Sequence, residues 1–249
     1  MDEVSVAAGQ QLGIKAFVLC GGLGTRLRAV LSDRPKSMAL VAGVPFLQLL
    51  LEQVRSQGVH QVILGTGYMA DQIESFFGDG KDLGLHISYS RETEQLGTGG
   101  ALKLAQPLLS DPILVLNGDS YAELDLGAIA ELFTKRNASV VIVLQTVPDV
   151  ARYGSVTIDA EGRVSDFVEK GARTGAGLIN AGIYLVRKEI ISGLPAGRPI
   201  SLEKDVFPEL LRGAVYGVVS EGVFIDIGIP SDLERAQSVL SPHARSSRK

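Results

Sequence analysis

A cluster of glycines and cations near the start of this 249-residue chain has the composition of a phosphate-binding site. Its glycines, threonine and arginine are Gly21, Gly22, Gly24, Thr25 and Arg26. A glycine-rich turn exposes backbone N–H groups that can approach a phosphate closely. Arg26 and, further along, Lys36 add the fixed positive charge that a nucleoside triphosphate requires. The segment therefore predicts a site for a phosphorylated nucleotide.

Several interpretations of the glycine turn compete. A nicotinamide dehydrogenase would need a glycine where Leu27 stands and an acidic residue at the end of the second strand, where the chain has Leu-Gly-Thr-Gly at 64–67. A P-loop would need a closing Gly-Lys-Ser/Thr, which this turn lacks. A structural tight turn fits the glycines alone equally well, and the cations that follow favour the phosphate site.

Two aspartates follow apolar runs much further along the chain. Asp119 comes after Ile113–Leu116 and is expected at the carboxyl end of a central parallel strand, where open α/β sheets have their ligand crevice. Asp226 ends a second apolar run, Val223–Ile225. Two carboxylates at one sheet edge can hold Mg²⁺, which completes its octahedron with water and substrate phosphates. Taken singly, either aspartate could equally be a helix cap or a turn former.

Alternating strand and helix patterns must position these groups over the first half of the chain. Strands are expected over Ile14–Leu19, Gln61–Leu64, Leu85–Ser90, Ile113–Leu116 and Ser139–Gln145. Helices are expected over Pro45–Gln57, Asp71–Phe77, Gly100–Leu104 and Leu126–Arg136. Because parallel strands need crossover connections and are buried on both faces, this alternation predicts a helix-covered, mostly parallel sheet.

The pattern changes after Pro148, where strand-like runs follow one another closely. Gly154–Ile158 and Val164–Val168 flank a hairpin turn, and Leu178–Val186 comes next, which predicts a small antiparallel insertion on the parallel core. The remaining expected elements are a helix over Leu202–Leu211, strands over Val215–Val219 and Val223–Ile225, and a helix over Ser231–Leu240. The predicted fold class is α/β, a Rossmann-like three-layer sandwich with a mostly parallel mixed sheet.

Composition excludes several classes of function. The formal net charge of −4, with no basic run except the tail 243–249, argues against a nucleic-acid-binding protein. The single cysteine, Cys20, excludes an intramolecular disulfide, and the first residues lack a signal-peptide pattern, so a cytoplasmic location is expected. No apolar run approaches the roughly 18 residues of a membrane span. Three scattered histidines offer no zinc-ligand cluster.

The segment 19–38, LCGGLGTRLRAVLSDRPKSM, resembles the signature of the sugar-1-phosphate nucleotidyltransferases, which runs GGxGTRL, a variable spacer, then PK. Ala29 stands where the commonest family form has a proline, and this version resembles the guanylyltransferases that act on D-glycero-α-D-manno-heptose 1-phosphate. Further motifs extend the resemblance over nearly the whole chain. They are Glu94–Gly100, Asn117–Asp119, Phe167–Lys170, Asn180–Gly182 and Asp226–Gly228.

The resemblance implies a Mg²⁺-dependent reaction in which a sugar 1-phosphate displaces pyrophosphate from a nucleoside triphosphate. Asp119 and Asp226 match the family's metal ligands, and Asp119 is also expected to be catalytic. Arg26 is assigned to the triphosphate and its leaving pyrophosphate, and Lys36 to the α-phosphate region. GTP and D-glycero-α-D-manno-heptose 1-phosphate are the implied substrates, giving GDP-heptose for surface-polysaccharide synthesis.

Two more groups of residues take their expected roles from the resemblance. Those on the nucleotide side are Gly21, Gly22, Gly24, Thr25, Gly97, Thr98 and Gly118. Those on the sugar-phosphate side are Gly154, Glu169, Lys170, Asn180 and Gly182. Thr98 could also be the N-cap of a helix, and both roles could hold together. The chain is expected to be a single domain, with a nucleotide-binding core over 14–147 and a sugar-phosphate-binding part over 148–240.

Other interpretations stay open at this point. Mannose 1-phosphate is the chief alternative acceptor within the same chemistry. A non-catalytic regulator that binds nucleotide sugars would keep the fold but would not need the full set of Arg26, Lys36, Asp119 and Asp226. No membrane or nucleic-acid partner is expected, and the sequence leaves open whether the chain forms a homo-oligomer.

Overall fold

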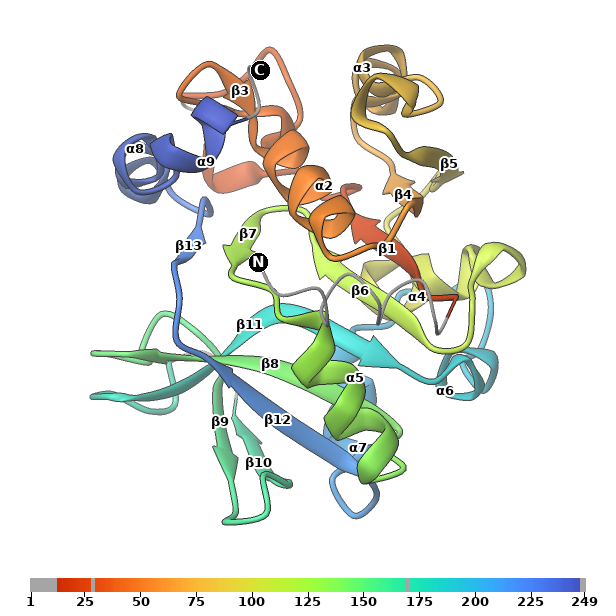
Figure 1. Cartoon of the computed structure of the whole chain (residues 1–249), viewed down its shortest axis with the longest axis vertical. Helices are drawn as coiled ribbons and strands as arrows, with labels where there is room; N and C mark the ends of the chain where they lie inside the picture. Colours follow the sequence, from red (N-terminus) through yellow and green to blue (C-terminus); the bar gives the residue numbers. More distant parts are fainter. Residues whose placement is uncertain (1–12, 28–29, 169–170, 247–249) are drawn as a thin grey trace.

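The computed structural model describes residues 13–27, 30–168 and 171–246 (Figure 1). Four neighbouring strands of its main sheet run parallel, in the order β6-β1-β4-β5. Their bounds are β1 (Lys15–Leu19), β4 (Gln61–Thr66), β5 (His86–Arg91) and β6 (Ile113–Asn117). Apolar side chains of β1 and β6 are buried on both faces, as central parallel strands require. The predicted parallel core is confirmed.

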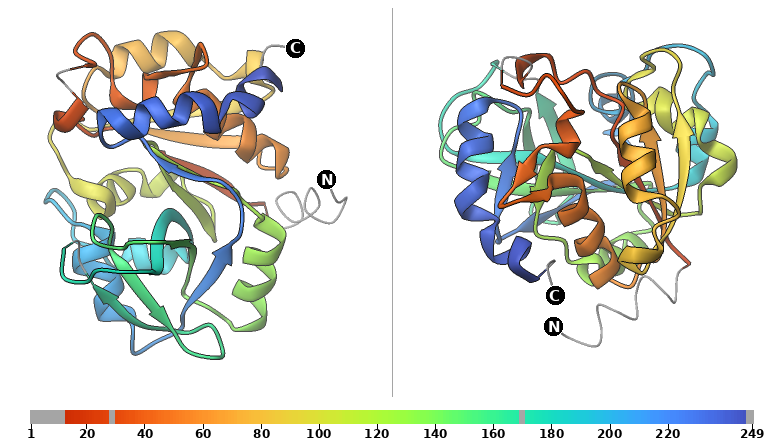
Figure 2. Two further views of the ribbon diagram at one scale, coloured as in Figure 1. Left: turned by 90° about the vertical axis from the view of Figure 1, so that its left-hand side faces the viewer. Right: turned by 90° about the horizontal axis from the view of Figure 1, so that it is seen from above.

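The same sheet continues into antiparallel strands from the second half of the chain. β11 (Gly177–Val186) runs antiparallel to β6 and to β8 (Val140–Val147), and β12 (Val215–Ser220) runs parallel to β8. β9 (Ser155–Ile158) and β10 (Val164–Val168) form the predicted hairpin. In both Figure 1 and the left view of Figure 2 this hairpin lies at the end of the molecule opposite α3 and α8. The sheet is therefore mixed, as expected.

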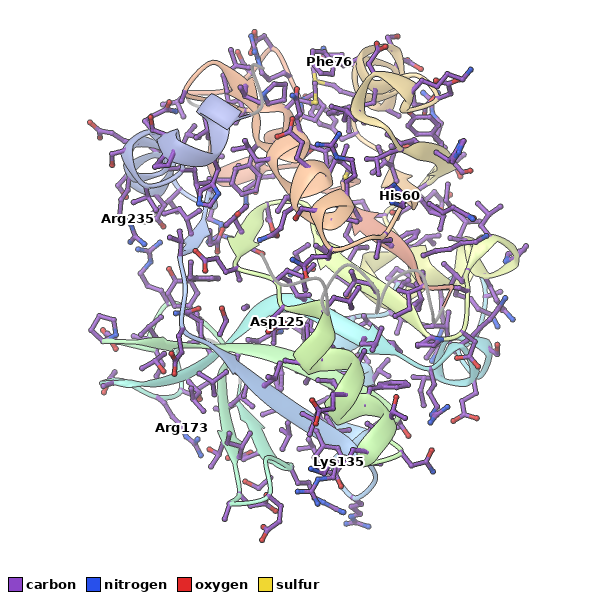
Figure 3. All side chains as sticks on the ribbon, in the orientation of Figure 1. His60, Phe76, Asp125, Lys135, Arg173 and Arg235 are labelled. Carbon is purple, nitrogen blue, oxygen red and sulfur yellow. The ribbon has the colours of Figure 1, made fainter. Side chains whose placement is uncertain are left out.

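Helices bury apolar side chains in two hydrophobic clusters, which the sheet separates. One cluster takes side chains from α2 (Phe46–Ser56), α3 (Ala70–Phe77), α5 (Leu126–Lys135), α8 (Pro230–Val239) and α9 (Ser241–Ser246). The other takes side chains from α4 (Gly97–Leu104), α6 (Lys188–Ser192) and α7 (Phe207–Leu210). Asp125, labelled in Figure 3, caps α5 by accepting a hydrogen bond from the Ala128 N–H at 3.0 Å.

Short elements that sequence patterns did not predict connect the larger ones. They are the 3₁₀ turns η1 (Thr25–Leu27), η2 (Lys36–Met38), η3 (Lys81–Leu83) and η4 (Gln106–Leu108), the strand pair β2 (Leu40–Val41) and β3 (Val44–Pro45), and β7 (Ser120–Ala122). β7 pairs antiparallel with β13 (Phe224–Asp226) in a sheet of its own. Within the described residues, no helix has both the length and the apolar character needed to cross a lipid bilayer.

The helix expected over Leu202–Leu211 is wrong as a single element. The structure has a π-helical turn, η5 (Leu202–Val206), followed by the short helix α7. Pro208 stands in the first turn of α7, where its missing N–H is tolerated, whereas an α-helix already under way would lose a hydrogen bond there. The break leaves η5 free to pack against α4.

Candidate active site

A cleft of about 650 Å³ opens where the carboxyl ends of β1 and β6 meet the start of α4. The predicted residues that line it are Gly21, Gly22, Gly24, Thr25, Arg26, Lys36, Gly97, Thr98, Gly118 and Asp119. This is the position at which open α/β sheets bind ligands, because the loops that follow neighbouring parallel strands meet there. The structure thus brings the predicted nucleotide side together in one cavity of substrate size.

The glycine loop is held against the strands beside it. The Cys20 N–H donates to the Gly65 carbonyl at 2.8 Å, which ties the loop to β4. Gly24 has a left-handed φ of +57°, and a Cβ atom there would lie 3.0 Å from the Lys36 side chain. Arg26 is exposed at the cleft, with its charge open to a ligand. The loop therefore offers backbone N–H groups and an exposed cation, and it is hydrogen bonded to the neighbouring strand.

The two aspartates are brought together by strand pairing. In the β7–β13 ladder Asp226 lies opposite Ser120, the residue that follows Asp119. The Ile227 N–H donates to the Asp119 carbonyl at 2.9 Å, and the Gly228 N–H donates to Asp226 Oδ1 at 2.7 Å. Backbone hydrogen bonds thus set how the two carboxylates approach one another.

Lys36 joins both carboxylates. Its Nζ lies 2.6 Å from Asp119 Oδ2 and 3.8 Å from Asp226 Oδ1, and its side chain is only 13% exposed. The two carboxylates therefore converge on a single positive charge, which is the arrangement that a divalent cation with oxygen ligands also requires. Among the described residues, no third His, Cys, Asp or Glu completes a metal-binding group. A metal held by this pair would take its other ligands from water and substrate phosphates.

The start of α4 forms another wall of the cleft. Gly97 has a φ of +68°, and a Cβ atom there would lie 2.5 Å from the Ile200 carbonyl oxygen, so only glycine fits. The Thr98 hydroxyl donates to Glu203 Oε2 at 2.8 Å and accepts from the Leu202 N–H at 2.7 Å. These bonds use the donor hydrogen of the hydroxyl within the protein, although Thr98 itself lines the cleft.

The predicted sugar-phosphate residues that the structure describes, Gly154, Asn180 and Gly182, are not part of the cleft lining, but Gly182 lies against Asn117, which is. The Asn180 N–H donates to the Gly154 carbonyl at 3.3 Å, so these two positions are neighbours. Gly182 is buried with a φ of +80°, and a Cβ atom there would lie 2.7 Å from Asn117 Nδ2 and from Ser120 Oγ. Glu169 and Lys170 lie outside the residues that the structure describes.

Several residues line the cleft that the sequence did not single out for a role. They are Ser37, Glu92, Gln95, Asn117, Pro199 and Gly228. Burial raises the pKa of Glu92, whose Oε2 accepts a hydrogen bond from the Leu96 N–H at 3.0 Å. Glu92 directly follows β5, and this position at the carboxyl end of a parallel strand is the sequence feature that could have identified it as a site residue. Burial also raises the pKa of the Cys20 thiol, which favours an apolar packing role over a nucleophilic one.

Comparisons with known proteins agree with this geometry. The nucleotidyl transferase family model matches residues 15–241. The chain is 39% identical to D-glycero-α-D-manno-heptose 1-phosphate guanylyltransferase of Aneurinibacillus thermoaerophilus, over 91% of this chain and 98% of that protein. It is also 39% identical to mannose-1-phosphate guanylyltransferase of Mycobacterium tuberculosis, over 91% of this chain but only 64% of that longer protein.

The crystal structure of HddC from Yersinia pseudotuberculosis has the same fold. It superposes with a TM-score of 0.80 at 39% identity, covering 90% of this chain and 97% of that one. A second structure of HddC, in complex with GMP-PN, superposes with a TM-score of 0.79. The family match spans the glycine loop, the α4 start and both aspartates. The chain therefore belongs to the nucleotidyl transferase family.

Proposed function

We propose that this chain transfers a guanylyl group from GTP to a sugar 1-phosphate and releases pyrophosphate. The observation that carries the proposal is the convergence of Asp119 and Asp226 on Lys36, since Lys36 and Asp119 line the same cleft as the glycine loop. The relatives named as guanylyltransferases support the choice of reaction and of base, as does the HddC complex with GMP-PN.

The nucleotide side of the site is assigned to the loop and the α4 start. Backbone N–H groups at Gly21, Gly22, Gly24 and Thr25 would hold the triphosphate, with Arg26 facing the departing pyrophosphate. A second set of small residues, Gly97, Thr98 and Gly118, would receive the base and ribose by close backbone approach. A Cβ atom at Gly118 would lie 2.6 Å from the Leu19 carbonyl oxygen, so the absence of a side chain is required there too.

The reaction would be an in-line displacement. A phosphate oxygen of the sugar 1-phosphate forms a bond to the α-phosphorus as the bond from that phosphorus to the leaving pyrophosphate breaks. Lys36 would stabilise the charge that develops on the α-phosphate oxygens. Asp119 and Asp226 would hold Mg²⁺, which when bound neutralises charge between two anions that must meet. Positioning and charge stabilisation are sufficient, so no covalent enzyme intermediate is required.

For the acceptor we favour D-glycero-α-D-manno-heptose 1-phosphate, with GDP-heptose as product. Two similar relatives carry that name, from Aneurinibacillus thermoaerophilus at 39% and Campylobacter jejuni at 37% identity. Mannose 1-phosphate is the second candidate, because the Mycobacterium tuberculosis relative is equally similar. The enzyme would make this product in the cytoplasm, as a precursor for the synthesis of a surface polysaccharide.

The sugar side is assigned to residues 148–240, with residues 14–147 forming the nucleotide-binding core. Gly154, Asn180 and Gly182 would shape the sugar pocket, since the Gly154 and Asn180 backbones are hydrogen bonded and Gly182 lies against Asn117. Glu169 and Lys170, outside the described residues, would contact the sugar hydroxyls and phosphate.

A substrate grid tests the proposal. The common nucleoside triphosphates are each combined with heptose, mannose and glucose 1-phosphates, with and without Mg²⁺, and pyrophosphate release is measured. The expected result is release with GTP and one manno-configured acceptor, dependent on Mg²⁺. Binding of GDP-sugars without any pyrophosphate release would instead support a non-catalytic regulator and overturn the proposal.

A further inference from the structure

A chain of hydrogen bonds leaves the cleft at Thr98 and passes through Glu203. The Glu203 carboxylate accepts the Thr98 hydroxyl at 2.8 Å and the Ser201 hydroxyl at 2.9 Å on Oε2. Its other oxygen, Oε1, accepts the Tyr184 hydroxyl at 3.0 Å. One carboxylate thus receives three side-chain hydrogen bonds, from α4, from β11 and from Ser201 two positions before it. Bonds of this charge-assisted kind are among the stronger ones in proteins.

The chain continues along β11. The Tyr184 hydroxyl accepts a hydrogen bond from Asn180 Nδ2 at 2.7 Å, and Asn180 Oδ1 accepts from the Gly182 N–H at 2.9 Å. Tyr184 is completely buried, and burial followed by the charge of Glu203 raises its pKa well above the usual value. Its hydroxyl therefore stays protonated and acts as a donor to Glu203.

The series of hydrogen bonds ends at Gly182, which packs against the loop that carries Asp119. Gly182 lies so close to Asn117 and Ser120 that a Cβ atom would come within 2.7 Å of both side chains. The Ser120 hydroxyl also donates to the Ala181 carbonyl at 3.3 Å. The two ends therefore reach different parts of the cleft lining, one at Thr98 and the other at Asn117, two positions before Asp119.

We propose that Glu203 is a positioning residue that sets the separation between the α4 start and the Asp119 loop. Hydrogen bonds constrain direction as well as distance, whereas apolar burial is non-directional. The inference rests on the proposed function, in which the α4 start holds the nucleotide and Asp119 holds the metal. Displacement of reacting groups by about 1 Å can cost roughly 100-fold in rate, so a spacer of this kind has a kinetic effect.

Two substitutions interrupt this series of hydrogen bonds while they change the volume of the side chain little. Glu203→Gln replaces one acceptor oxygen by an NH₂ donor, which then faces a hydroxyl donor. Tyr184→Phe removes only the hydroxyl and keeps the ring packed against Phe207, whose centroid lies 5.0 Å away. The matched controls are Glu209→Gln, at an exposed glutamate, and Tyr216→Phe, at a buried tyrosine of β12 outside the chain.

The measurements are kcat, KM for both substrates, and calorimetric affinity for the α,β-methylene analogue of the triphosphate that the wild type uses. We expect Glu203→Gln and Tyr184→Phe to lower kcat by roughly 10- to 100-fold, and the controls to stay near wild type. Tyr184→Phe should also lower the affinity for the nucleotide analogue, although Tyr184 lies on β11 and not on the proposed nucleotide side. Thr98→Val should lower kcat and the affinity for the analogue by a similar factor. In the Thr98→Val/Tyr184→Phe double variant, the loss in free-energy terms should be smaller than the sum of the two single losses.

The outcomes separate the inference from the proposed function. No pyrophosphate release by the wild type with any triphosphate overturns the proposed function. Normal release by the wild type, with kcat and nucleotide affinity in Tyr184→Phe and Thr98→Val equal to those of the controls, overturns the positioning role alone. These two variants keep the carboxylate, so they decide the question if Glu203→Gln fails to fold in a thermal melt.

Discussion

Lys36 Nζ lies 2.6 Å from Asp119 Oδ2, although 83 positions separate the two residues in the chain. The ammonium is largely shielded from water, and it is also within 3.8 Å of Asp226 Oδ1. Opposite charges at this separation attract strongly in a partly buried site. The side chain that the proposed mechanism needs at the α-phosphate is therefore already held in the lining of the cleft.

Replacing Lys36 by methionine should mainly slow the chemical step. We expect kcat to fall by roughly 100- to 1,000-fold, the range seen when one preorganised charge-stabilising group is lost. KM for the sugar 1-phosphate should change much less, because Lys36 contacts the carboxylates and the nucleotide side. Steady-state kinetics measures both, with exposed Lys135→Met as the control (Figure 3). A large rise in sugar KM with unchanged kcat would assign Lys36 to the acceptor instead.

Asp119→Asn and Asp226→Asn should each remove Mg²⁺-dependent pyrophosphate release while the fold persists. The loss in metal affinity should exceed the roughly 10- to 100-fold that removal of an outer-shell partner costs. Binding of Mn²⁺, followed by electron paramagnetic resonance, reports the affinity without turnover, and circular dichroism checks the fold. Asp82→Asn, at an exposed position on η3, is the control. Mn²⁺ affinity that stays at the wild-type value in both variants contradicts the metal assignment.

Gly97→Ala should destabilise the protein more than a positive φ alone explains. At Gly97 the new Cβ would meet the Ile200 carbonyl oxygen at 2.5 Å, and a backbone oxygen cannot swing aside. Gly197 has a similar φ of +70° with nothing within 4 Å, so Gly197→Ala measures conformational strain by itself. That strain should cost roughly 1–2 kcal/mol. Denaturant unfolding compares the two variants, and equal losses would show that the contact at Gly97 is relieved.

Glu92→Gln should alter the pH dependence of stability. Burial raises the folded-state pKa of Glu92 above its usual value of 4.5. The folded state therefore binds a proton more tightly than the unfolded state, and ionisation of this carboxyl costs stability as the pH rises through the folded-state pKa. The glutamine stays neutral and can still accept from the Leu96 N–H.

The thermal midpoint of Glu92→Gln should thus exceed that of the wild type by the largest margin at neutral pH. The advantage should shrink as the pH falls toward 4.5, where wild-type Glu92 becomes protonated. The exposed Glu94→Gln is the control for a simple change of net charge. A midpoint difference that is constant from neutral to acidic pH would contradict the raised pKa.

Much of the architecture could be predicted because local patterns of apolar and turn residues specify where the strands lie. β1, β4, β5 and β6 lie within two residues of their expected bounds, since apolar runs bounded by turn residues mark buried strands. The start of α4 was expected at Gly100 but lies at Gly97. Glycines are poor helix formers, so propensity argued against them, whereas contact with Ile200 requires them.

The sequence by itself determined that the glycine loop with Arg26 and the segment with Asp119 each follow a strand, because strand periodicity and turn composition are local properties. Only the tertiary structure decided that Asp226 lies across a β-ladder beside Asp119, and that Glu203 binds Thr98 from 105 positions away. Contacts of this kind depend on how distant segments pack. Many carboxylates in a chain have similar local surroundings, and packing selects the one that reaches a given hydroxyl.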